Sequence, residues 1–180
     1  MNFARISLSA LMASTLAFGL AGCDEDSTSA ATPAAPVSAA PLVVSGATPS
    51  TANGTLDKAT GIGESGISDA TGNFSSGGPN NYCRAAVYAL TNSGDGRKYV
   101  VQVVFDKTTR AVTYVSLAED AASPSFMARA NAGLASVAVD IANRRIGFTA
   151  TALTGANPAT LNGSLEYVTN GSVADRANCG

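Results

Sequence analysis

Residues 99–105 (Tyr-Val-Val-Gln-Val-Val-Phe) constrain the fold of this chain more than any other segment. The segment consists almost entirely of β-branched and aromatic residues, which favour a strand. Successive side chains of a strand point to opposite faces, and here both faces are apolar, with Val101 and Val103 on one and Val100 and Val104 on the other. Because such a strand needs cover on both sides, we predict that this segment is a central strand of a sheet.

Other segments rich in strand-forming residues surround this one. Turn-forming residues separate them, for example at 92–96 (Asn-Ser-Gly-Asp-Gly) and 155–158 (Gly-Ala-Asn-Pro), and turns of this kind between apolar segments indicate hairpins. The pattern predicts a mainly β fold: a small antiparallel sheet of about six strands, either a sandwich or a partly closed barrel. The strands are expected at 82–90, 99–105, 112–117, 136–141, 145–153 and 160–168.

The stretch between the third and fourth of these strands has a different pattern. Ser123 followed by Pro124 fits a helix that begins with a capping serine and a proline in its first turn. Phe126 and Met127 would then share one side of the helix, and Gly133 suits its end. We therefore predict one short helix here, of at most about two turns, that covers the sheet.

The residues before the first expected strand have a composition that argues against a packed core. Residues 27–56 carry no charge and are mainly Ala, Ser, Thr and Pro, and glycine becomes frequent over 47–78. Such sequences bury too little apolar surface to offset the entropy of ordering the chain. We predict a disordered tether over 23–79, followed by a folded β domain over 80–180. The apolar cluster at 41–44 (Pro-Leu-Val-Val) could dock as an edge strand.

The first residues have the layout of a secretory signal peptide. Arg5 is followed by residues 6–22, which are uncharged, apolar at their centre and small at their end. The alternative is a retained transmembrane helix, for which this stretch lies at the low edge of the necessary length. Several serines weaken that alternative further, and we assign residues 1–22 as the signal peptide.

The leader ends at residues 20–23 in the sequence Leu-Ala-Gly-Cys, and in this the chain resembles bacterial lipoproteins. In that family the cysteine thiol is diacylglyceryl-modified, the leader is cleaved directly before it, and the new amine is usually acylated. The resemblance covers residues 1–23 and implies that Cys23 is the first mature residue and a lipid anchor, carrying fatty acids such as palmitate. The alternative is a soluble secreted form with an ordinary Cys23 thiol.

The resemblance also implies a location. A lipoprotein of this kind is exported and lipid-anchored at the bacterial cell envelope, and we expect the domain to face the periplasm. Acidic residues follow the cysteine at 24–26 (Asp-Glu-Asp), and this pattern leaves both the inner and the outer membrane open.

The two other cysteines, Cys83 and Cys179, lie at opposite ends of the predicted domain. In an oxidising compartment two such thiols are expected to form a disulfide. The bridge would attach the C-terminal tail to the start of the first strand of the domain. Two free thiols are the alternative.

Composition restricts the possible chemistry. The chain has no histidine and a formal net charge of −2, which excludes Ser-His-Asp and Cys-His sites and histidine-ligated metals and argues against nucleic acid as a partner. Asp95, Asp106 and Asp140 fall at predicted turns, where a carboxylate usually accepts backbone N–H groups. No catalytic, cofactor-binding or metal-binding residue is predicted.

These observations favour a non-catalytic protein with a binding or structural role at the cell envelope. Its expected partners are the membrane, through the lipid on Cys23, and an envelope protein. An envelope inhibitor or a small-ligand-binding barrel is a related alternative. A hydrolase that uses carboxylates is the alternative from another class.

Overall fold

The computed structural model describes residues 36–58, 66–70, 82–120, 126–130, 133–167 and 179. All of them belong to the second of the two units into which the chain divides, Ala31–Gly180. The expected signal peptide, Cys23 and residues 24–35 lie outside the described residues. A short 3₁₀ turn occupies Ser50–Ala52, and the other elements are the strands β1 (Leu42–Ser45), β2 (Gly54–Lys58), β3 (Gly66–Ala70), β4 (Tyr82–Asn92), β5 (Lys98–Asp106), β6 (Val112–Glu119), β7 (Phe126–Arg129), β8 (Val137–Asp140), β9 (Arg145–Thr154) and β10 (Pro158–Glu166).

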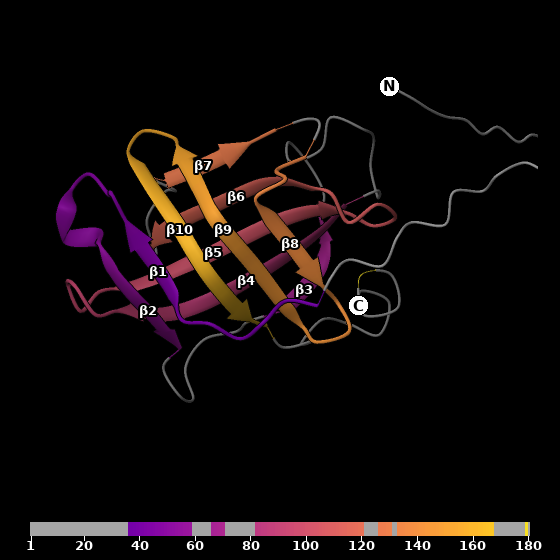
Figure 1. Ribbon diagram of the computed structural model, residues 1–180, viewed down its shortest axis with the longest axis horizontal. Helices are drawn as coiled ribbons and strands as arrows, with labels where there is room; N and C mark the ends of the chain where they lie inside the picture. The colour runs from indigo at the N-terminus through magenta and orange to yellow at the C-terminus, as the bar shows by residue number, and fades with distance from the viewer. Residues whose placement is uncertain are drawn as a thin grey trace, which may run out of the picture. The chain divides into compact units, whose positions relative to one another are not determined.

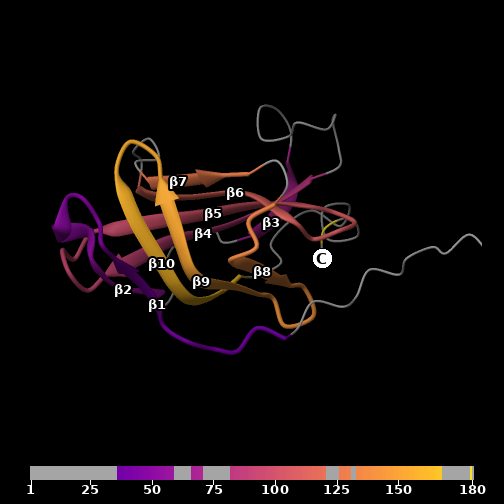
Figure 2. The ribbon, with the colours of Figure 1, turned by 45° about the horizontal axis from the view of Figure 1, so that its top comes forward.

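The strands form one antiparallel sheet that curls into a half-barrel (Figure 1). Nine of them follow the order β7-β6-β5-β4-β2-β1-β10-β9-β8, and β3 pairs with β4 beside this path. We call β4–β7 the first wall, and β1, β10, β9 and β8 the second wall; β2 joins the two. Figure 2 shows the strands of the second wall crossing in front of those of the first, with β9 approaching β7.

The mainly β, antiparallel prediction is confirmed, and the number of about six strands is wrong. Each of the six expected segments overlaps a strand, from β4, β5 and β6 to β8, β9 and β10. The additional strands β1, β2, β3 and β7 are only four or five residues long. Segments this short contain too few residues for a strand period to be recognised in the sequence, and their pairing with longer neighbours holds them in the sheet.

Strands β1 and β2 shift the start of the folded domain well before residue 80. Leu42 and Val44 of β1 are buried, whereas Val43 faces outward. β1 pairs with β2 on one side and with β10 on the other, so the apolar cluster that could dock at an edge is an interior strand. The expected tether therefore includes sheet residues over 42–58, and the composition of this stretch concealed them.

The predicted short helix is replaced by strand β7. Phe126–Arg129 pairs with β6, with Met127 opposite Ser116 and Phe126 opposite Leu117. The chain buries Phe126 and Ala128 on one face of the strand, a period-2 pattern that a four-residue segment cannot distinguish from one helical turn. Residues 121–125, which include Ser123 and Pro124, lie outside the described residues.

One hydrophobic core lies between the two walls, and the expected disulfide closes one end of it. Cys83 of β4 is bonded to Cys179, with their Cα atoms 5.7 Å apart, and this prediction is confirmed. Both cysteines are fully buried. The largest fully buried side chains come from both walls and include Leu42, Leu90, Val101, Phe105, Leu117, Ile146, Leu153, Leu161 and Tyr167.

Candidate functional site

A cavity of about 310 Å³ lies where strand β1 begins. β1 starts at Leu42, opposite Leu56 of β2, but both of its neighbours continue past this point. β2 runs on through Asp57, and β10 runs on to Glu166. The missing strand length leaves a slot in the wall of the half-barrel, and the slot leads to the interior side of β4.

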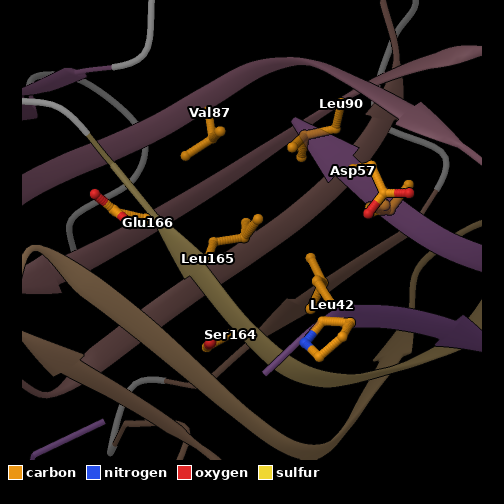
Figure 3. Close-up of a pocket in the computed structure, with 9 residues that line it drawn as sticks. Leu42, Asp57, Val87, Leu90, Ser164, Leu165 and Glu166 are labelled. Atoms are coloured by element: carbon orange, nitrogen blue, oxygen red, sulfur yellow. The ribbon is translucent and has the colours of Figure 1, made fainter. Parts of the chain in front are cut away.

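The floor of the cavity is apolar and comes from four strands. The side chains converge between β4 and β10, as Figure 3 shows. All are at most 6% exposed, so they belong to the core and line the cavity at the same time. They are Leu42 of β1, Leu56 of β2, Val87 and Leu90 of β4, and Leu165 of β10.

The rim of the cavity is polar and carries two carboxylates. Asp57 comes from β2, and Ser164 and Glu166 come from β10. The Glu166 carboxylate lies 3.5 Å from the Arg145 guanidinium, and its side chain is 65% exposed. Figure 3 places Asp57 and Glu166 on opposite sides of the leucine side chains.

A glycine in β10 allows another segment of the chain to approach closely at the edge of the slot. Gly163 of β10 has φ +116°, and a Cβ at this position would collide with the carbonyl of Pro41. The same position follows an irregularity in the pairing of β10 with β9. Glycine therefore permits the close approach at which residues 36–41 leave β1 and cross β10.

Residues 36–40, which we call the strap, run over the outer face of the second wall (Figure 1). Ala40 N–H donates to Ser164 Oγ at 2.9 Å, and Ser164 N–H donates to the Ala40 carbonyl at 3.1 Å. At the other end Val37 N–H donates to Asp140 Oδ2 at 3.0 Å. A second hollow, of about 420 Å³, lies between the strap and strands β8–β10.

The three predicted turn aspartates do accept backbone N–H groups. Asp95 accepts from Arg97, Asp106 from Thr108 and Thr109, and Asp140 from Asn143. The Asn143 side-chain amide, the Val37 N–H and the Asn143 N–H together hold the pKa of Asp140 below its usual value. For Asp106, partial burial acts to raise the pKa, but the hydrogen bonds from Thr109 and Thr108 outweigh it and lower it.

Two buried tyrosines differ in what their hydroxyl groups contact. Burial, and then a 2.8 Å hydrogen bond that the hydroxyl donates to Asp95 Oδ2, raise the pKa of Tyr99 to about 12. Burial likewise raises the pKa of Tyr167 to about 12, but its buried hydroxyl has no hydrogen-bond partner among the described residues. Neither Tyr99 nor Tyr167 lines the cavity at the slot.

Sequence reasoning missed the residues of the cavity. Its rim carboxylates, Asp57 and Glu166, lie on strand ends, and its floor depends on the different lengths of β1, β2 and β10. The alternation of Leu42 and Val44 was the available signal, but strand lengths and pairing are tertiary properties that this pattern does not fix.

Comparisons with protein families, with curated proteins and with solved structures gave no match for this chain. Within the described part of the chain, no helix has the length and hydrophobicity needed to cross a bilayer. Within that same part, no group of three or more Cys, Asp and Glu side chains is placed to hold a metal ion.

Proposed function

We propose that this protein is a lipid-anchored lipoprotein of the bacterial cell envelope whose β domain binds a partner or ligand without catalysing a reaction. The anchor rests on the Leu-Ala-Gly-Cys sequence directly after an apolar leader. Acyl chains contribute about 0.8 kcal/mol per buried methylene, so two or three chains on Cys23 would make the attachment effectively permanent.

The early start of the folded domain supports a location close to the bilayer. The strap begins at residue 36, and its Val37 is already bonded to Asp140. Only residues 24–35 separate it from Cys23, and a chain of this length spans about 45 Å at most when fully extended. The domain would therefore meet partners at or near the membrane surface, and not far from it as a tether ending at residue 79 would allow.

The half-open cavity is the observation that carries the binding role. A concave site with an apolar floor and a few polar groups at its rim is the usual form of a ligand site, and the slot at β1 has this form. The same observation supports the small-ligand-binding barrel among the alternatives. A purely structural protein has no need of a slot in its wall.

Metabolic labelling with a palmitate analogue tests the anchor. We expect the label on the wild-type protein, no label on Cys23→Ser, and undiminished label on the double variant Cys83→Ser/Cys179→Ser, because those two thiols form the disulfide. Fractionation should then find Cys23→Ser processed poorly and absent from the mature lipidated pool. Label that persists on Cys23→Ser, or a wild-type protein without label, would show that the anchoring proposal is wrong.

A further inference from the structure

We infer that the cavity at the start of β1 binds a small amphiphile with an unbranched apolar body and a cationic head, such as an alkylamine. The inference rests on the proposed binding role and adds the class of ligand. The apolar body would enter through the slot onto Leu42, Leu90 and Leu165, and the head would stay at the rim beside Asp57.

The size of the cavity limits the ligand to a small molecule. Ligand sites in proteins have volumes of about 300 to 1,000 Å³, and the cavity, at about 310 Å³, lies at the lower end of this range. A folded partner would not fit into it. A short alkyl chain is small enough for a cavity of this volume.

The floor selects an apolar body. The five side chains that form it are leucines and a valine, so they offer no hydrogen bonds. A polar group placed among them would lose its hydration without compensation. An alkyl chain in the same place would remove apolar surface of both the ligand and the protein from water, which is favourable.

The rim selects the charge of the head. Both charged side chains that line the opening within the described residues are carboxylates, Asp57 and Glu166, and Asp57 is exposed. Arg145 offsets part of the charge of Glu166 at 3.5 Å, so Asp57 would be the main contact of the head. An ammonium group would be attracted there, whereas a carboxylate or phosphate head would be repelled.

Photoaffinity labelling of the lipidated protein in its own membranes tests this inference. The probe is decylamine that carries a diazirine in its chain, and the cross-linked residues are mapped by mass spectrometry. We expect cross-links at the floor, in peptides that contain Leu42 or Leu165. Unlabelled decylamine should compete about fivefold better than decan-1-ol, the upper end of the contribution of an exposed ion pair, and decanoate should compete worst.

Variants at the rim and the floor make the test specific. In Asp57→Asn, decylamine should compete with the probe only about twofold better than decan-1-ol does. Val87→Phe should abolish labelling, because the larger side chain fills the cavity. The control is Glu119→Gln, because Glu119, like Asp57, is a carboxylate accessible to solvent, but it lies outside the cavity.

Each outcome bears on either the inference or the proposed anchor. The inference would be overturned by cross-links outside the floor, or by equal competition from the three decyl compounds. It would also be overturned if decylamine kept its full advantage over decan-1-ol in Asp57→Asn. Because Asp57→Asn changes an exposed side chain, its result does not depend on whether Val87→Phe folds. Labelling of the floor in a protein that carries no palmitate would leave the inference standing and refute the anchor alone.

Discussion

The two walls of the half-barrel bury their strands differently. In the first wall, β4, β5 and β6 are buried on both faces: Val103 and Val104, adjacent along β5, are both 0% exposed. In the second wall, buried and exposed residues alternate along β1 and along much of β9 and β10. The second wall thus follows the usual pattern of an antiparallel sheet with one face in water, and the first does not.

The outer face of the first wall has a hydrophobic cluster of its own. Tyr82, Val104 and Tyr114 are buried there, and Met127 packs against them. The Arg129 guanidinium lies over the Tyr114 ring, 4.9 Å from its centroid. The first wall is therefore stabilised by packing on two sides, while the second depends on the core between the walls and on the strap. Differences in stability between matched substitutions should reveal this asymmetry.

Loss of the disulfide should have the largest effect, because it ties the first wall to the end of the chain. Cys83 and Cys179 are 96 residues apart in the sequence, and closing a loop of this length restricts the unfolded chain by roughly 4 kcal/mol. Cys83→Ala/Cys179→Ala should lower the free energy of unfolding by about this amount in urea denaturation. The wild-type protein under strong reductant is the matched control, and a double variant as stable as the oxidised protein would contradict the prediction.

Asn92→Ala should come next, because Asn92 holds the junction between the walls. Its side chain is fully buried, donates to the Ala52 carbonyl at 2.7 Å and accepts from Gly94 N–H at 2.7 Å. Alanine would leave both backbone groups without these partners, at a cost of about 2 to 3 kcal/mol. Asn162→Ala, in the exposed face of the second wall, is the control and should cost about 0.5 kcal/mol. Equal losses of stability in the two variants would show that the Asn92 hydrogen bonds do not stabilise the junction between the walls.

A pair of identical substitutions compares the outer faces of the walls directly. Val104→Ala removes two fully buried methyl groups and should cost about 2 kcal/mol. Val43→Ala, on the outer face of β1, removes the same groups from a side chain that is 37% exposed and should cost less than about 0.5 kcal/mol. Similar costs for the two variants in chemical denaturation would refute the proposed asymmetry.

The smallest effects concern one tyrosine from each wall. Tyr99→Phe should cost about 1 kcal/mol, because it removes the hydrogen bond to Asp95. Tyr167→Phe should be neutral or slightly stabilising, because it removes a buried hydroxyl that has no partner in the part of the chain that the structure describes. Thermal unfolding at neutral pH measures both, and a larger loss for Tyr167→Phe would show that its hydroxyl is hydrogen-bonded in solution.

The same two tyrosines predict how stability depends on alkaline pH. Their pKa values are raised in the folded protein from 10.0 to about 12, so their contribution is fully present below pH 10.0 and is lost as the pH rises toward about 12. Tyrosinate absorbance of the wild-type protein should show two groups that ionise late, and each Tyr→Phe variant should lack one of them. Both tyrosines titrating near 10.0 in the folded protein would contradict their burial.

The first wall, which is buried on both faces, was easier to predict from the sequence than the second wall, which is buried on one. In β4, β5 and β6, runs of apolar residues on both faces are strong local signals, and these strands and their hairpins were predicted. β1 has only Leu42 and Val44 pointing inward, within a stretch whose Ala, Ser and Pro content resembles a linker. The cavity follows from where β1 starts relative to its neighbours, and only the pairing of strands determines that. The disulfide was predictable because the expected lipidation of Cys23 leaves two cysteines, and the expected export places them in an oxidising compartment.

The strap also determines how the domain would respond to being pulled. In the proposed anchored form, tension between the membrane and a bound partner enters the domain at residue 36. The hydrogen bonds of the strap join Val37 to Asp140 and Ala40 to Ser164. They follow one another along the chain, so force would break them one after another and each would bear the load alone. β1 would then be loaded along its axis, with its bonds to β2 and β10 perpendicular to the force and sharing it. The domain would thus yield by the length of the strap before its sheet resists.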